Sequence, residues 1–206
     1  MNQSLSQAER TANTINKLNE AVIEKLVTLG YSGCTTQKIA AEAGLSTGAI
    51  FRHFETLQEL IIDTADKLST WMVDDYHNKI APLKNKGVFE LDTSMEALYD
   101  VMQSPMHYAW LELLIASRTN ESLREAMQPI VRKNRDYALQ RSREYLPDFF
   151  VNQPDFEHLL ESLLMQIRGD MMHQFALSEQ EIKEKGEFHM RYISMMTCSS
   201  KSVQPS

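Results

Sequence analysis

The spacing of apolar residues limits the fold of this chain more than any other feature. Along almost the whole sequence these residues recur every three or four positions, as on one face of an α-helix, and no stretch shows the sustained alternation of a β-strand. In the first segment this face consists of Ile15, Leu18, Val22, Leu26 and Leu29. Gly30 is expected to end that helix. The pattern predicts an all-α fold of about nine helices.

Proline and small polar residues mark the expected boundaries of the later helices. Thr35, Ser46 and Thr56 are expected to cap the second, third and fourth helices. Pro82 is expected to end the fourth helix and to lead into a polar loop over residues 83–93. The helices after the first are predicted over about residues 36–43, 47–53, 57–80, 94–103, 106–118, 122–145, 156–177 and 179–197.

Residues 35–54, TTQKIAAEAGLSTGAIFRHF, contain two short predicted helices joined through a turn at Gly44. Glycine tolerates the backbone angles that such a turn requires. Two short helices with this connection are typical of a helix-turn-helix motif, in which the second helix enters the major groove of DNA. We therefore expect residues 1–55 to form a DNA-binding domain, residues 56–198 a larger helical domain, and residues 199–206 a disordered tail.

Several side chains of this segment match the chemistry of double-stranded DNA. Gln37, Lys38 and Thr47 carry amide, ammonium and hydroxyl groups that suit base edges, and Arg52 and His53 can reach phosphate oxygens. The full set of predicted DNA-binding residues is Thr36, Gln37, Lys38, Ser46, Thr47, Gly48, Ala49, Phe51, Arg52 and His53.

The charge of the chain gives this prediction little help. The chain has 21 basic and 28 acidic residues, a net charge of −7, whereas nucleic-acid-binding domains are usually basic. The basic residues of the first 54 positions are Arg10, Lys17, Lys25, Lys38 and Arg52, and the acidic ones are Glu9, Glu20, Glu24 and Glu42. Binding is therefore expected to depend on individual contacts more than on bulk charge.

The stretch GYSGCTTQKIAAEAGLSTGAIFRHFETLQELI, residues 30–61, resembles the DNA-binding domain of the TetR family of bacterial regulators. The residues that carry the resemblance are Gly30, Tyr31, Thr35, Ile39, Ala40, Ala43, Gly44, Ser46, Gly48, Ile50, Phe51, His53, Phe54 and Leu60. It extends over about residues 12–62. The resemblance implies a cytoplasmic, homodimeric transcriptional regulator that binds a near-palindromic operator, most often as a repressor, and responds to a small-molecule effector.

Two positions depart from the pattern of the family. Phe51 stands where the family usually has a tyrosine whose hydroxyl contacts phosphate, and Leu57 stands where the family favours a phosphate-binding lysine. The Phe51 ring is left with the sugar–phosphate edge or a thymine methyl group as its contact. Each lost phosphate contact lowers the salt dependence of binding by about one unit, so weaker binding is expected.

The resemblance also implies that the second part of the chain binds an effector and forms the dimer. Each of the last two helices carries a wide apolar band, and such a band needs a covering surface. The residues predicted for the dimer interface are Leu160, Leu163, Ile167, Ile182, Gly186, His189 and Ile193. The alternative is that both bands belong to the core of a single chain.

An effector pocket is predicted from aromatic, histidine and methionine residues, because methionine lines adaptable apolar cavities. The predicted lining residues are Tyr99, Met102, His107, Trp110, Tyr137 and Met165, and the expected effector is small and largely apolar. Ordinary packing is the alternative for each residue, and control by a protein partner is the alternative for the regulator. Arg168, within an apolar helix, is expected to pair with an acidic residue; the alternative is an anionic effector.

The sequence contains no nucleophile elbow, phosphate-binding loop or metalloprotease motif. A helical enzyme with a metal site stays a remote alternative; its one candidate set is Asp170 and His173 with Glu157, His158 and Glu161. We therefore predict no catalytic residue, no cofactor and no metal.

The two cysteines, Cys34 and Cys198, do not have the spacing of a zinc site or a disulfide framework, and Cys34 is expected to be a packed thiol. No apolar run is long enough to span a membrane.

Overall fold

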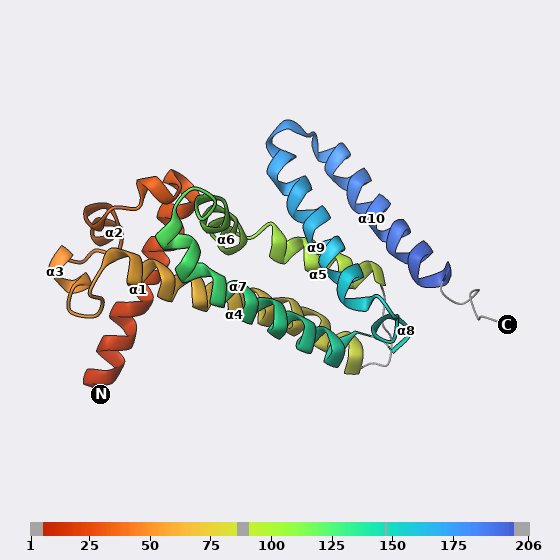
Figure 1. Ribbon diagram of the computed structural model, residues 1–206, viewed down its shortest axis with the longest axis horizontal. Helices are drawn as coiled ribbons and strands as arrows, with labels where there is room; N and C mark the ends of the chain where they lie inside the picture. The colour runs from red at the N-terminus through yellow and green to blue at the C-terminus, as the bar shows by residue number, and fades with distance from the viewer. Residues whose placement is uncertain (1–5, 86–90, 147, 200–206) are drawn as a thin grey trace, which may run out of the picture. The chain divides into compact units, whose positions relative to one another are not determined.

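A computed structural model of the chain describes residues 6–85, 91–146 and 148–199 (Figure 1). Within these ranges the secondary structure consists of helices without any strand, so the predicted all-α fold is confirmed. The elements are α1 (Gln7–Leu29), η1 (Tyr31–Gly33), α2 (Thr36–Glu42), α3 (Thr47–Ile50), α4 (Leu57–Asn85), α5 (Leu91–Met102), α6 (Pro105–Ala116), α7 (Glu121–Tyr145), α8 (Asp148–Val151), α9 (Phe156–His173), η2 (Gln174–Ala176) and α10 (Glu179–Ser199), where η marks a 3-10 helix.

The structure corrects the predicted end of the fourth helix. Helix α4 continues through Pro82 to Asn85. A proline loses one backbone hydrogen bond, but its fixed φ is compatible with a helix, and at Pro82 the loss falls in the last turn. The predicted loop over 83–93 is therefore too long at both ends, and residues 86–90 lie outside the described residues, as do residues 200–206 of the predicted tail.

The chain divides into two compact units. The first combines the residues up to Met72 with Ser104–Arg135, and the second combines Val73–Gln103 with the residues from Asp136 onward. The units thus do not follow the order of the sequence, because α5 belongs to the second unit and α6 to the first. The functional boundary predicted near residue 55 stays a prediction.

In the first unit, α1 packs against α2 and α6. The apolar face predicted for α1 is largely correct, because Leu18, Val22 and Leu26 are buried, while Leu29 at the end of the helix is exposed. The starts of the helices are fixed locally: the Thr56 hydroxyl accepts from Glu59 N at 3.1 Å. A carboxylate oxygen of Glu59 in turn accepts from Glu55 N at 2.7 Å. The first bond satisfies a free N–H group in the first turn of α4, and the second fixes the residue before Thr56 on that turn.

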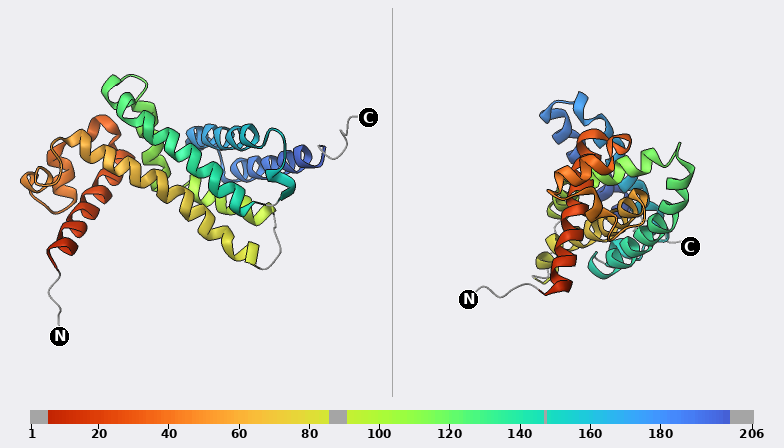
Figure 2. Two further views of the ribbon diagram at one scale, coloured as in Figure 1. Left: turned by 60° about the horizontal axis from the view of Figure 1, so that its bottom comes forward. Right: turned by 90° about the vertical axis from the view of Figure 1, so that its left-hand side faces the viewer.

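In the second unit, α9 and α10 run side by side in opposite directions, as the views of Figures 1 and 2 show, and α5 contacts both. Its interior includes Leu98, Phe156, Leu160, Ile167 and Met171. None of the described helices has the length and apolar character needed to cross a membrane.

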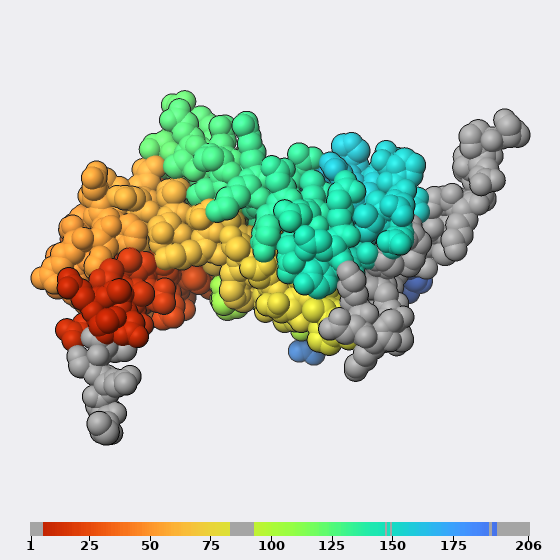
Figure 3. All heavy atoms as spheres, turned by 90° about the horizontal axis from the view of Figure 1, so that it is seen from below, coloured from red at the N-terminus to blue at the C-terminus, as the bar shows by residue number. Residues whose placement is uncertain are grey.

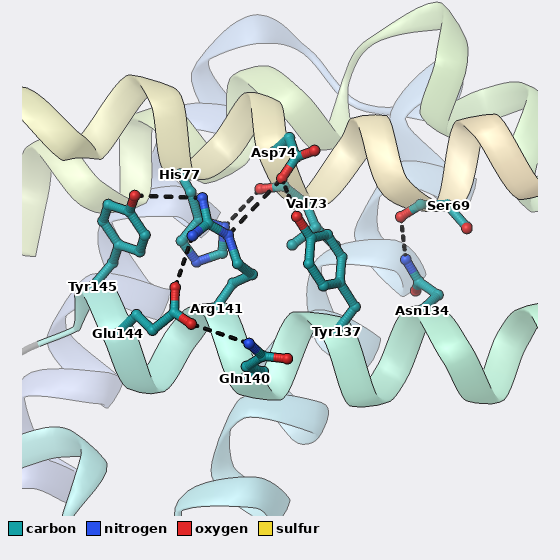
Figure 4. Close-up of polar contacts among 10 residues, drawn as sticks. All are labelled: Ser69, Val73, Asp74, His77, Asn134, Tyr137, Gln140, Arg141, Glu144 and Tyr145. Carbon is teal, nitrogen blue, oxygen red and sulfur yellow. Dashed lines mark hydrogen bonds and ion pairs between the residues drawn. The ribbon is translucent and has the colours of Figure 1, made fainter.

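Polar side chains join the second half of α4 to the second half of α7 (Figure 4). The Tyr137 hydroxyl donates to the Asp74 carboxylate, and Arg141 Nε lies 3.9 Å from Asp74 Oδ1. His77 is buried beside them, with Nδ1 2.6 Å from the Val73 carbonyl oxygen, and burial lowers the pKa of its imidazole. These contacts fix the two helices in register through directional hydrogen bonds.

Candidate nucleic-acid interface

The turn between α2 and α3 follows the predicted geometry. Gly44 has a φ of +64°, in the left-handed region that glycine adopts without strain. Thr35 caps α2, because its hydroxyl accepts from Lys38 N at 3.4 Å. Ser46 occupies the N-cap position of α3, but no capping hydrogen bond from its side chain is present among the described residues. Its hydroxyl is therefore not committed to the helix.

The predicted DNA-binding residues lie together on the outer side of this motif. Ile39, Ala40 and Ile50 are buried and hold the two helices to the first unit. The exposed members of the predicted set are Gln37, Lys38, Ser46, Thr47, Gly48, Phe51 and Arg52, and the half-buried members are Thr36, Ala49 and His53. In the space-filling view of Figure 3 the orange atoms of this part of the chain lie at the surface beside the red atoms of α1. Their contact with DNA stays a prediction.

Two of the basic residues on this surface are available for a ligand. Within the part of the chain that the structure describes, Lys38 and Arg52 form no ion pair. Lys25, by contrast, is paired with Glu42 at 2.5 Å. Phosphate binding by α2 and α3 would therefore depend on Lys38 and Arg52.

Buried polar contacts orient the motif on its supporting helices. The Thr64 hydroxyl donates to Asn19 Oδ1 at 2.8 Å and so links α4 to α1. Tyr31 N, just after α1, donates to a carboxylate oxygen of Glu112 in α6 at 2.8 Å. Cys34 is buried in the same region, and burial raises the pKa of its thiol to about 11, as expected of a packed cysteine. No local pattern in the sequence predicts the contact between Glu112 and Tyr31, because the two residues are 81 positions apart.

The residues predicted to line an effector pocket are not brought together. His107 and Trp110 are buried in the first unit, whereas Tyr99, Met102, Tyr137 and Met165 belong to the second. Met165 is 58 % exposed, because it lies on the side of α9 opposite the buried Ile167. Helical periodicity identifies the apolar residues of each helix, but it does not show which helix faces line the same pocket.

The second unit does contain a small pocket, formed by α5, α9, η2 and α10. Its lining residues are Tyr99, Gln103, Ile167, Asp170, Met171, Gln174, Leu177, Ile182 and Lys185. Of the residues predicted for a pocket, only Tyr99 is among them. The floor of this pocket is apolar, since Ile167 and Met171 are buried, and its charged groups come from Asp170 and Lys185.

A chain of polar contacts crosses the wall of this pocket. The Tyr99 hydroxyl hydrogen-bonds to His189 Nδ1, and His189 Nε2 lies 3.4 Å from Asp170 Oδ2. Lys185 Nζ lies 2.7 Å from Asp170 Oδ1. Burial raises the pKa of Tyr99 to about 12 and lowers the pKa of His189. At neutral pH the phenol of Tyr99 and the imidazole of His189 are therefore both neutral.

The residues predicted for the dimer interface face mainly into their own chain. Leu160, Ile167 and His189 are buried, Leu163, Ile182 and Gly186 are half-buried, and the side chain of Ile193 lies outside the described residues. Gly186 lies against α5 of the same chain, where a Cβ atom would make an ordinary contact with the Tyr99 ring at 3.9 Å, so the spacing of α10 and α5 does not require glycine there. For Leu160, Ile167 and His189 the burial favours the alternative interpretation, the core of a single chain, whereas a dimer contact of the others stays a prediction. The exposed large apolar residues of the same region are Met165, Met172, Phe175, Phe188 and Tyr192.

The predicted ion pair of Arg168 is not formed among the described residues. Its Nε atom is buried without a hydrogen-bond partner, and burial lowers the pKa of the guanidinium group. Asp170, two residues further on, is engaged by Lys185 and His189. Among the residues that the structure describes, no Asp or Glu is fully buried, so Arg168 has no buried acidic partner there.

The single candidate metal set is not assembled either. In the described ranges no group of three or more His, Cys, Asp or Glu side chains could hold a metal ion. Glu157 pairs instead with Arg143 at 2.7 Å, and His173 Nδ1 lies 2.9 Å from the Gly169 carbonyl oxygen. The alternative of a helical metalloenzyme loses its only candidate site.

Comparison with known proteins agrees with the motif and the fold. Residues 23–64 match the family model of bacterial regulatory proteins of the tetR family. The HTH-type transcriptional regulator CymR of Pseudomonas putida is 28 % identical over 167 residues, 80 % of each chain. The uncharacterized HTH-type transcriptional regulator Rv2912c of Mycobacterium tuberculosis is 28 % identical over 126 residues, and the match spans 61 % of this chain and 64 % of the relative.

Solved structures share the fold at low sequence identity. A transcriptional regulator from Rhodococcus sp. Rha1 aligns with a TM-score of 0.64 and 16 % identity over 93 % of this chain and 99 % of the other. A TerR/AcrR-family regulator from Aquifex aeolicus VF5 aligns with a TM-score of 0.61 and 19 % identity over 89 % of this chain and 99 % of the other.

A helix-turn-helix motif in an all-helical chain is typical of DNA-binding regulatory proteins. Over residues 23–64 the chain is similar to the tetR family of bacterial regulatory proteins, and its relatives and structural neighbours are regulators of this kind. The relatives and structural neighbours are transcriptional regulators, in agreement with the prediction that the chain is not an enzyme.

Proposed function

We propose that this protein regulates transcription by binding double-stranded DNA as a homodimer, with one α2–α3 motif of each copy on each half of a near-palindromic operator. The observation that carries the proposal is the exposure of Lys38 in α2 and of Arg52 just after α3, above a buried apolar layer. A dimer on an operator excludes other proteins from that DNA, so we propose repression as its effect. Such an activity belongs to the cytoplasm, where the operator lies.

Selection of bound sequences from random DNA, followed by fluorescence-anisotropy titration at several salt concentrations, tests this proposal. We expect Arg52→Ala, which removes a predicted phosphate contact, to weaken binding to all sequences and to lower the salt slope by about one for each half-site. Lys183→Ala, an exposed lysine of α10, is the matched control and is expected to leave both quantities unchanged. Folded protein that binds no DNA at low salt would contradict the proposal.

For the dimer we propose a contact through the outer face of α9 and α10, defined by Met165, Met172, Phe175, Phe188 and Tyr192. Phe175 is 90 % exposed. The rings of Phe188 and Tyr192 are stacked with centroids 6.2 Å apart, so they offer one continuous apolar surface. Exposed apolar patches of this kind mark interaction surfaces, and a second copy of the chain carries the same patch.

For the effector we propose the pocket of the second unit, which combines an apolar floor with the polar groups of Tyr99, Asp170 and Lys185. This composition suits a small, largely apolar molecule with one polar group. A thermal-shift screen tests the proposal, since a specific ligand stabilises the protein and releases it from DNA. We expect Tyr99→Phe, which keeps the ring and removes the hydroxyl, to weaken that ligand. A screen without a stabilising compound would favour control by a protein partner.

A further inference from the structure

The outer side of α3 is unusually poor in hydrogen-bonding groups for a helix that reads DNA. Before Arg52 it offers Thr47, Gly48, Ala49 and Phe51. Phe51 is 53 % exposed, while its neighbours Ile50 and Phe54 are buried and fill the interior. The Phe51 ring therefore contributes little to the core, and it presents a large apolar surface where a ligand would bind.

Gly48 keeps that ring uncovered. It lies three residues before Phe51 and Thr47 lies four before it, so all three share one side of the helical turn. Gly48 does not have a positive φ, and a Cβ atom built there would meet nothing closer than Ser46 Oγ at 3.8 Å. Neither backbone conformation nor space requires glycine at this position, although glycine in a helix costs about 0.5–1 kcal/mol. What the glycine provides is an open approach to Thr47 and Phe51.

The chemistry of the major groove then limits what this surface can recognise. A phenylalanine ring neither donates nor accepts a hydrogen bond, and the apolar group that a base pair presents in the major groove is the 5-methyl group of thymine. We propose that Phe51, left open by Gly48, covers a thymine methyl group in each half-site, so that α3 reads its operator mainly by apolar contact. This inference rests on the proposed binding of DNA through α2 and α3.

Thymidine and deoxyuridine differ only in that methyl group, and this makes the proposal testable atom by atom. The operator is obtained by selection from random DNA, and each thymine is replaced by uracil, one symmetric pair at a time. We expect one pair to weaken binding of the wild-type protein about fourfold per half-site, the effect of one buried carbon, or roughly 15-fold for the palindrome. The other pairs are expected to have little effect.

Two variants assign the effect to the ring. Phe51→Ala is expected to bind the thymine and uracil operators equally, whereas Arg52→Ala, the matched control, is expected to weaken both and to preserve their ratio. Because Phe51 is exposed, its substitution leaves the fold intact, which thermal unfolding checks directly.

Uracil substitutions without effect on the wild-type protein, or an unchanged thymine–uracil ratio in Phe51→Ala, would overturn the inference while leaving DNA binding in place. In that case the ring packs on the sugar–phosphate edge. A folded protein that selects no DNA would overturn the proposed function itself, and the inference with it.

Discussion

The α1–α3 segment and the α9–α10 hairpin show equally clear helical periodicity, yet the sequence describes the two regions with different success. In the first, the residues predicted to bind DNA are exposed or half-buried, and the apolar residues Ile39 and Ile50 between them are buried. In the second, Leu160, Ile167 and His189 were expected at a surface between two chains and lie inside one chain. Periodicity thus identifies an apolar face, but it does not identify the partner of that face.

Local chemistry explains the success in the first region. The cap at Thr35 and the positive φ of Gly44 fix where each short helix begins and ends. Once those ends are fixed, the spacing of Ile39 and Ile50 determines which side chains of α2 and α3 point outward. Sequence alone therefore predicts both faces of the motif.

Helix α9 carries apolar residues on two opposite sides, and this explains why the sequence did not show which side packs within the chain in the second region. Ile167 lies on the buried side and Met165 and Met172 on the exposed side. A helix that is apolar all round is covered on both sides, either by its own domain or by another chain. The distinction between the two depends on α5 and α10, which lie far away in the sequence.

The largest expected effect is on the free energy of unfolding, and it concerns the buried side of α3 in the first region. Ile50→Ala removes a fully buried side chain from α3 and should lower the free energy of unfolding by about 2–4 kcal/mol. Phe51→Ala, the adjacent and exposed control, should change it by less than about 0.5 kcal/mol. Urea denaturation followed by circular dichroism measures both. Equal losses would show that the faces of α3 are not distinct.

An intermediate effect is expected on the outer face of α9 and α10. Met172→Glu places a charge on the proposed dimer contact and should shift sedimentation from dimer to monomer while the helices stay folded. Lys183→Glu changes the charge of the same hairpin by a larger amount and should leave the dimer intact. If Met172→Glu also sediments as a dimer, the second region pairs through another surface or not at all.

The smallest effect concerns the buried histidines of the second unit. Burial lowers the pKa of His77 and His189 in the folded protein, so between those values and about 6.5 the unfolded chain binds more protons. The free energy of unfolding should therefore be constant above about pH 6.5 and fall as the pH decreases below it. Urea midpoints at pH 7.5 and 5.5 measure the change, which should shrink in His77→Gln and persist in the exposed control His158→Gln. A midpoint that rises on acidification would contradict the sign.

The two candidate sites differ in how far the sequence predicts them, as the two regions of the fold do. The DNA-binding surface follows from one contiguous segment of sequence, in which caps, turn and polar residues have fixed spacing. The pocket could not be predicted in the same way, because Tyr99, Asp170 and Lys185 come from three helices and meet only in the tertiary structure. Pro82 is a smaller case, since the cost of a proline depends on its position in a helix whose end the sequence does not mark.

The central claim is that two copies of the chain, joined through α9 and α10, bring two α2–α3 motifs to one operator. The most direct test is the stoichiometry of the complex between the full-length protein and a selected operator, measured by native mass spectrometry or sedimentation velocity. We predict two chains per duplex, with half-site centres separated by about one helical turn of DNA or a multiple of it, and weaker binding when one half-site is scrambled. A stable complex of one chain per duplex, indifferent to loss of a half-site, would contradict the account.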